Sequence, residues 1–123
     1  MKAVFVSAVL LAIATATLTC TTGQVYVKVT KKSMSWAAEE SYEIWGNGAK
    51  LANNPTLANN ELRDTEFCIA STSNNQYTLK MKDNYGDSWT SGSWIMVEGI
   101  YGNIVYKGFL TDNNLEELPI SLY

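Results

Sequence analysis

Histidine is missing from the 123 residues of this chain, and cysteine and proline occur only twice each. Without histidine the chain lacks the commonest general base and the commonest metal ligand, so Ser-His-Asp catalysis, Cys-His catalysis and imidazole-dependent zinc sites are excluded. Two cysteines can build neither a four-cysteine zinc site nor a disulfide-dense miniprotein. What remains is a chain of one domain's length without a histidine-based catalytic centre.

Charged side chains are scarce as well, at 17% of residues, and the formal net charge is −3. A negative chain is poorly suited to phosphate backbones, so no nucleic-acid partner is expected. Asn, Ser, Thr and Gly are plentiful instead, a composition typical of extracellular β proteins. The carboxylates are numerous enough for a glycosidase pair, but no spacing selects two of them and so short a chain has little room for a deep cleft. We therefore expect a protein that is not an enzyme.

The first residues have the order of a secretory signal peptide. A positive start at Lys2 precedes an apolar run over residues 3–14, and small polar residues follow. The run is too short for a membrane span of ~20 residues, and no second apolar segment follows it, so the mature chain is expected to be secreted and not to span a membrane. We expect cleavage after Gly23, giving a signal peptide of residues 1–23, because a signal ending at Ala16, the alternative, is short.

The cleavage site decides the fate of the two cysteines. A cut after Ala16 leaves Cys20 free to pair with Cys68, and an exposed thiol in a secreted protein tends to oxidise. A cut after Gly23 removes Cys20 and leaves Cys68 alone. A Cys20–Cys68 disulfide is therefore expected only if Cys20 is retained.

Apolar and polar residues alternate through the rest of the chain. The period-two pattern is plainest over residues 25–30 and 77–82. Further strands are expected over residues 41–45, 66–70, 93–97, 103–110 and 115–122, with turn signals between them. Pro119 places the last strand at a sheet edge, and residues 36–40 are long enough only for a single helical turn. The pattern predicts one all-β domain over residues 24–123, an antiparallel β-sandwich of about eight strands.

The predicted strands are arranged as a repeat. A shift of 52 residues brings the strand at residue 25 onto the strand at residue 77 and, without a gap, Tyr42 onto Trp94. Both of these aromatic residues are expected in the core. We predict two similar ~50-residue units, 24–72 and 76–123, packed face to face because neither is large enough to bury a core alone.

One loop differs from its counterpart at the same shift. Residues 83–89 concentrate oxygen ligands, whereas the matching loop carries Lys31 opposite Asp83 and should repel a cation. Gly86 allows a sharp reversal, and calcium prefers about 6–8 oxygens from carboxylates and carbonyls, so the loop is a candidate calcium site. The alternative is a polar hairpin loop that uses Asp, Asn and Gly for turn chemistry. The candidate metal ligands are Asp83, Asn84, Asp87 and Ser88.

The stretch YTLKMKDNYGDSW, residues 77–89, resembles the Y-x-L-x-x-x-D-x-Y-G-D-G-W segment of small two-repeat β-sandwich domains in secreted and surface proteins of protists, algae and marine bacteria. Residues 39–42, EESY, resemble the E-T-S-W signature of the earlier unit of these domains. Ser88 stands where the domains usually have Gly, and Lys31-Lys32 replaces their acidic start. The resemblance implies a non-catalytic extracellular adhesion or binding module, with calcium as an expected ligand.

Three aromatic residues, Trp36, Tyr85 and Trp89, lie in or beside the two matching loops. Exposed rings beside amides and carboxylates suit a sugar, because a ring face takes the apolar side of the sugar and polar groups take its hydroxyls. The alternative is a set of aromatic residues that cap the sandwich. We expect a secreted, calcium-stabilised binding module that recognises a glycan, a cell surface or an extracellular protein. The alternative function is a small structural or assembly protein of an extracellular coat or matrix, whose sheet edges pair with copies.

Overall fold

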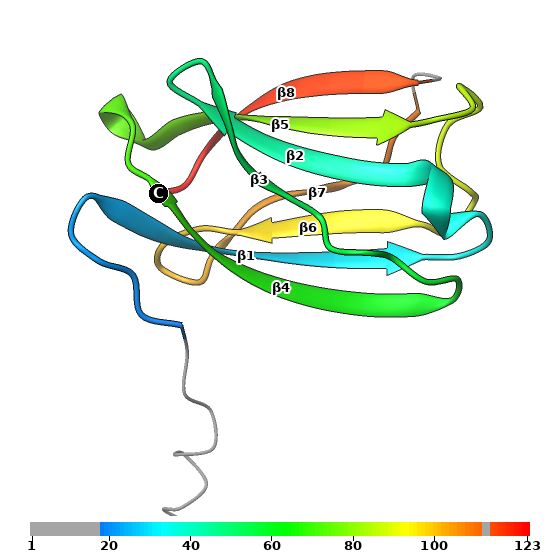
Figure 1. Ribbon diagram of the computed structural model, residues 1–123, viewed down its shortest axis with the longest axis horizontal. Coiled ribbons are helices and arrows are strands. Elements are labelled where there is room, and N and C mark those ends of the chain that lie inside the picture. The colour runs from blue at the N-terminus through cyan, green and yellow to red at the C-terminus, as the bar shows by residue number, and fades with distance from the viewer. Residues whose placement is uncertain (1–17, 112–113) are drawn as a thin grey trace, which may run out of the picture.

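The computed structural model describes residues 18–111 and 114–123. In this part of the chain, eight strands form two four-stranded antiparallel sheets that stack as a sandwich (Figure 1). The elements are β1 (Gln24–Ser33), η2 (Ala37–Glu39), β2 (Glu40–Gly46), β3 (Ala49–Asn53), β4 (Glu61–Ala70), η3 (Ser73–Asn75), β5 (Gln76–Asp83), β6 (Trp94–Glu98), β7 (Ile104–Gly108) and β8 (Leu115–Ser121). The predicted antiparallel β-sandwich is confirmed.

Each sheet combines strands from both halves of the chain. The first sheet has the order β4-β1-β6-β7 and the second has the order β3-β2-β5-β8. Every neighbouring pair is antiparallel. Pro119 lies in β8, an edge strand, where its missing N–H leaves no gap between two strands.

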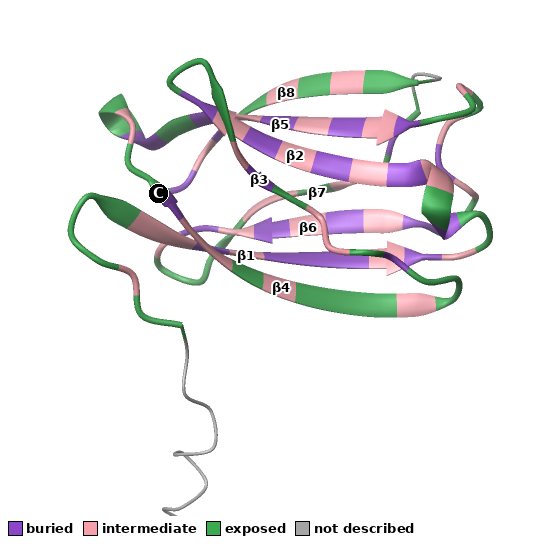
Figure 2. Cartoon of the chain, viewed as in Figure 1, coloured by how far each residue is buried: buried purple, intermediate pink, exposed green. Residues whose placement is uncertain are grey.

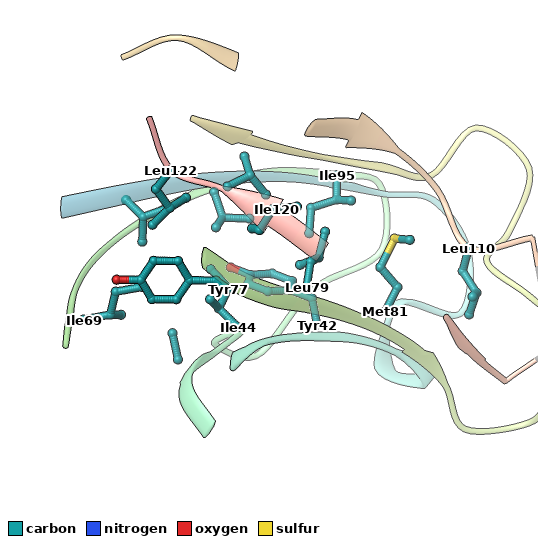
Figure 3. Close-up of a cluster of buried hydrophobic side chains, with 14 of the residues drawn as sticks. Tyr42, Ile44, Ile69, Tyr77, Leu79, Met81, Ile95, Leu110, Ile120 and Leu122 are labelled. Carbon is teal, nitrogen blue, oxygen red and sulfur yellow. The ribbon is translucent and has the colours of Figure 1, made fainter. Parts of the chain in front are cut away.

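Buried and less buried residues alternate along the central strands (Figure 2). The buried side chains fill the space between the sheets (Figure 3). Val27 and Val29 of β1 are wholly buried, and so are Leu79 and Met81 of β5, as period-two alternation predicts. Tyr42 of β2 lies among them, fully buried. Because each buried aliphatic side chain contributes about 1.5–3 kcal/mol, these two inner faces supply most of the driving force for folding.

Strand β3 was not among the strands expected from sequence patterns. Its sequence, Ala-Lys-Leu-Ala-Asn, has low β propensity, and of its residues only Ala52 is buried. Strand β4 also starts earlier than expected, at Glu61, because an exposed edge tolerates the charged residues Arg63 and Asp64. Both differences concern edge strands, where the apolar signal is weakest.

The topology has the symmetry that two similar units would produce. Exchanging β1–β4 for β5–β8 converts the strand order of one sheet into that of the other. The residue alignment fails in one strand, however. Tyr42 is buried, whereas Trp94, its counterpart at the 52-residue shift, is half-buried on the outer face of β6. The prediction that Trp94 lies in the core is therefore wrong. A one-residue shift in the alignment of a strand moves each side chain to the opposite face of the sheet. The duplication itself stays a prediction.

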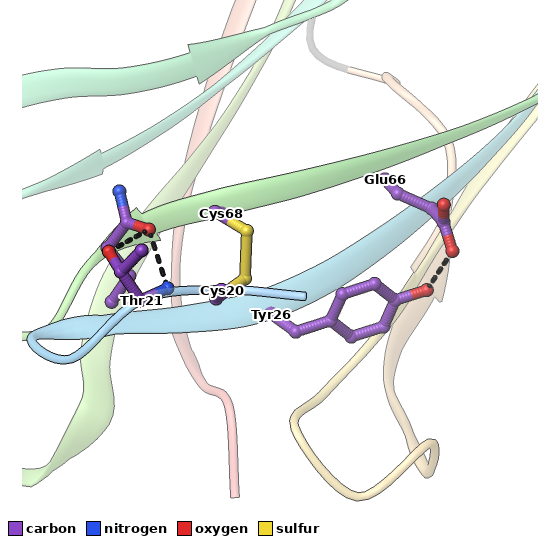
Figure 4. The surroundings of a disulfide bond; sticks show 6 residues. Cys20, Thr21, Tyr26, Glu66 and Cys68 are labelled. Atoms are coloured by element: carbon purple, nitrogen blue, oxygen red, sulfur yellow. Dashed lines mark hydrogen bonds between the residues drawn. A yellow bond between two sulfur atoms is a disulfide. The ribbon is translucent and has the colours of Figure 1, made fainter. Parts of the chain in front are cut away.

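A disulfide joins Cys20 to Cys68 at the end of the sandwich where β1 begins (Figure 4). Cys68 faces Tyr26 in the register of β4 with β1, and the bond ties the segment before β1 to β4. This is the pairing expected if Cys20 is retained: a cut after Ala16 keeps it, and the cut after Gly23 removes it. Most of the predicted signal peptide, residues 1–17, lies outside the described residues. In the described segments, no helix has the length and apolar character needed to cross a membrane.

Candidate functional site

Two connections meet at the opposite end of the sandwich from the disulfide (Figure 1). One is the η2 turn between β1 and β2, and the other is the loop from β5 to β6, residues 84–93. The N–H of Asn84 donates a hydrogen bond of 2.9 Å to the carbonyl oxygen of Glu39, so the two connections are joined through the backbone. Trp36 and Ser88, which match at the 52-residue shift, both have left-handed backbones, with φ of 61° and 70°.

Three carboxylates converge where these connections meet. Oxygens of Glu39, Asp83 and Asp87 all lie within 4.8 Å of one another. Asp83, the last residue of β5, is buried, and its Oδ2 accepts a hydrogen bond of 2.8 Å from the N–H of Asp87. Asp83 and Asp87, predicted as metal ligands, are thus brought together around one point.

Glu39 is the member of this cluster that the local sequence pattern does not reveal. It lies far from the loop in sequence, and only the pairing of Glu40 with Asp83 in the β2–β5 register carries it there. Of the two other predicted ligands, Asn84 is exposed and engages Glu39 through its backbone. Ser88 has a left-handed φ, a conformation that glycine adopts more easily, and it does not line the hollow beside Glu39 and Asp87.

The electrostatics of the cluster favour a cation. Burial raises the pKa of Asp83, and the carboxylate of Asp87 adds to this rise, whereas the backbone N–H of Asp87 opposes it. Burial also raises the pKa of Glu39, with smaller contributions from Asp87 and Asp83. Each ionised carboxylate therefore disfavours the next, and a divalent cation would relieve that repulsion. Three carboxylates, each with two oxygens, fit the donor chemistry of calcium.

Two exposed aromatic side chains flank the carboxylates. Trp36 is 67% exposed and Tyr85 is 76% exposed. Together with Glu39 and Asp87 they line a hollow of about 370 Å³. A left-handed backbone is strained for a bulky residue such as Trp36, and such strain persists only where the surroundings hold it. Here the carbonyl oxygen of Trp36 accepts a hydrogen bond of 3.0 Å from the N–H of Glu39.

Trp89 does not belong to this exposed pair. It is only 6% exposed, its indole N–H donates a 2.8 Å hydrogen bond to the carbonyl oxygen of Lys82, and the Nζ of Lys31 lies 4.1 Å from its ring centroid. The expectation that Trp89 offers a ring face to a ligand is therefore wrong. Trp89 instead caps the core, as in the alternative interpretation given above for Trp36, Tyr85 and Trp89.

Lys31 is also placed differently from the sequence expectation. It lies near the end of β1, wholly buried, and its Nζ pairs with the buried carboxylate of Glu40. The second oxygen of Glu40 accepts a 3.0 Å hydrogen bond from the N–H of Thr90. Burial lowers the pKa of Lys31, and the Glu40 carboxylate opposes that shift. Lys31 thus anchors the β5–β6 loop through its contacts with Glu40 and with the Trp89 ring. It does not lie in an exposed loop where it could repel a cation.

The raised pKa values of Asp83 and Glu39 predict an unusual pH dependence for the metal-free protein. A carboxyl whose pKa is higher in the folded chain binds protons more readily there, so acidification stabilises the fold. We expect the melting temperature in chelator-treated buffer to rise as the pH is lowered toward the ordinary pKa values of these carboxyls, 3.8 for Asp83 and 4.5 for Glu39. Burial raises the pKa of Glu43, but its hydrogen bonds with Trp45 and Lys82 make the overall shift a lowering, so the opposing loss from Glu43 begins near its ordinary pKa of 4.5. Differential scanning calorimetry of the wild type and Asp83→Asn checks this: the rise should be smaller in the variant, and equal rises would contradict the assignment.

No family model, curated protein or solved structure matches this chain. The resemblance to two-repeat β-sandwich domains therefore rests on the residues quoted for it. Any inference about the site therefore starts from its geometry: three carboxylates that converge on one point, with the exposed rings of Trp36 and Tyr85 beside them.

Proposed function

We propose that this protein is a secreted, non-catalytic module that binds glycans through calcium held by Glu39, Asp83 and Asp87. The observation that carries the proposal is that Trp36 and Tyr85 line one hollow together with two of these carboxylates, Glu39 and Asp87. The third, Asp83, is buried next to them. A calcium ion held there would offer its remaining coordination positions to sugar hydroxyls, since calcium takes about 6–8 oxygen ligands. A flat ring would take the apolar face of the same sugar.

Binding suits this site better than catalysis does. The three carboxylates lie within 4.8 Å of one another, which places them around one shared cation and leaves no space for a substrate between an acid and a base. The hollow lies at the end of the sandwich where the η2 turn and the β5–β6 loop meet. A cell-surface glycan or a glycosylated extracellular protein is the partner that this arrangement favours.

Secretion is part of the same proposal. A disulfide between Cys20 and Cys68 is compatible with an oxidising compartment. Retention of Cys20 requires the cut after Ala16, so we propose that the mature chain begins at Thr17.

A glycan array tests the proposed function. Labelled protein is applied with millimolar calcium and again after chelation, together with the variants Asp83→Asn and Trp36→Ala. The asparagine keeps an acceptor for the N–H of Asp87 but removes a charge, so the fold is preserved while calcium is lost. Binding should need calcium and should disappear in both variants. Binding that is unchanged by chelation and by both substitutions would exclude this site.

An assembly protein of an extracellular coat is the second candidate. The observation that favours it is a group of exposed apolar residues at the disulfide end: Tyr101 and Tyr123 stack with ring centroids 6.3 Å apart, and Ile104 on the edge strand β7 is 59% exposed. Exposed apolar groups of this kind mark contact surfaces. Light scattering at increasing concentration tests it: oligomers that Ile104→Lys disperses would support assembly, and a monomer throughout would exclude it.

A further inference from the structure

A second hollow lies beside the later half of the β5–β6 loop. It measures about 420 Å³ and opens between this loop and the segment that follows β7. It shares no lining residue with the hollow at Trp36 and Tyr85. The residues used below are Ser88, Ser91, Gly92, Trp94 and Phe109.

The wall of this hollow is aromatic and hydroxylic but uncharged. Trp94 is half-buried on the outer face of β6, and Phe109 is 54% exposed. The side-chain hydroxyls of Ser88 and Ser91 make no hydrogen bond with any other described residue, so both are available to a ligand. No lining residue carries a formal charge.

These features select a neutral sugar. A cationic ligand would lose its hydration without meeting a counter-charge, and the cation beside the wall that could meet an anionic ligand, Lys107, already lies over the Trp94 ring. A wholly apolar ligand would leave the serine hydroxyls without partners. A neutral pyranose has an apolar face for a ring and hydroxyls for the serines. The volume lies within the ordinary range of ligand pockets, about 300–1,000 Å³.

The wall is also held in place before any ligand binds. The N–H of Thr90 donates to Glu40, and the hydroxyl of Thr90 donates a 2.6 Å hydrogen bond to the carbonyl oxygen of Ser35. Gly92 has φ of +93°, and a Cβ there would come within 3.3 Å of Met34, so the loop packs closely against its neighbour. The Nζ of Lys107 lies 4.7 Å from the Trp94 ring centroid, which restricts the orientation of that ring. A preformed wall reduces the entropy lost on binding.

We propose that this second hollow is a metal-independent subsite for a neutral sugar residue of a glycan. The inference rests on the proposed function for its ligand class, but not on calcium. The two subsites would lie on either half of one loop, the first dependent on calcium and the second independent of it.

The test uses isothermal titration with three neutral probes, cellotriose, mannotriose and chitotriose, with calcium and after chelation. Phe109→Ala removes an exposed ring, and Ser91→Trp fills the hollow from an exposed position; neither touches the core. Trp36→Ala and Tyr85→Ala are the matched controls, because they remove exposed rings from the other hollow. Unchanged circular dichroism confirms that each variant is folded.

At least one probe should bind after chelation, and each of Phe109→Ala and Ser91→Trp should weaken that binding by about tenfold or more. The two control variants should leave it unchanged. Absence of binding by any probe after chelation overturns the subsite, and so does binding that persists in Phe109→Ala and Ser91→Trp. Calcium-dependent binding that is lost only in Trp36→Ala and Tyr85→Ala would leave the proposed function standing and remove this inference alone.

Discussion

Replacing Lys31 by methionine should lower the free energy of unfolding by about 3–5 kcal/mol, the usual cost of breaking a buried ion pair. The substitution leaves the Glu40 carboxylate without its ammonium partner at a position where both side chains are almost completely buried. It also removes the cation from the face of Trp89. Urea denaturation measures the effect as a lower midpoint with an unchanged slope.

A second substitution separates the ion pair from simple packing. Glu40→Gln keeps an acceptor for the N–H of Thr90 but carries no charge. Combined with Lys31→Met, it should recover much of the lost stability, since no unpaired charge is then buried. A single Lys31→Met variant within about 1 kcal/mol of the wild type would show that the pair is solvated and that Lys31 does not anchor the loop.

Replacing both Cys20 and Cys68 by serine should cost about 4 kcal/mol. The disulfide closes a segment with a sequence separation of 48, and the lost constraint falls mainly on the unfolded chain. Chemical denaturation of the secreted double variant, compared with the oxidised and reduced wild type, measures the effect.

The same material decides the cleavage site. Intact mass and N-terminal sequencing should give a chain that begins at Thr17 with both cysteines oxidised. A chain that begins at Gln24 would contain no Cys20 and would contradict the bridge. In that case reduction would leave the unfolding midpoint unchanged.

Period-two alternation was enough to predict the fold, because the inner faces of β1 and β5 are apolar over most of their length, up to Lys31 and Asp83 near the ends of the strands. It was not enough for β3, whose alanines and asparagine give no strand signal at a sheet edge. Alternation also could not show which face of β6 matches the inner face of β2. A gapless alignment pairs Tyr42 with Trp94, but a one-residue change in the strand turns Trp94 outward.

The candidate site was predictable in part. Asp83 and Asp87 lie in one short loop, so their chemistry is visible in the sequence. Glu39 joins them only through strand pairing, a long-range contact without a local pattern. Lys31 and Trp89 are buried against each other, and Lys31 is also paired with Glu40. The residue type alone could not have shown this, because a lysine or a tryptophan can be exposed as well as buried.

Calcium titration followed by thermal unfolding tests the central claim most directly. If Glu39, Asp83 and Asp87 hold the ion in the folded chain only, an excess of about a hundredfold over Kd should stabilise it by about 2.7 kcal/mol. For a domain of this size that is a rise in Tm on the order of 10 °C. Asp83→Asn should remove most of this rise, whereas Glu98→Gln, at the far end of β6, should retain it. A wild-type Tm that stays constant up to millimolar calcium would contradict the calcium site and, with it, the calcium-dependent recognition of glycans.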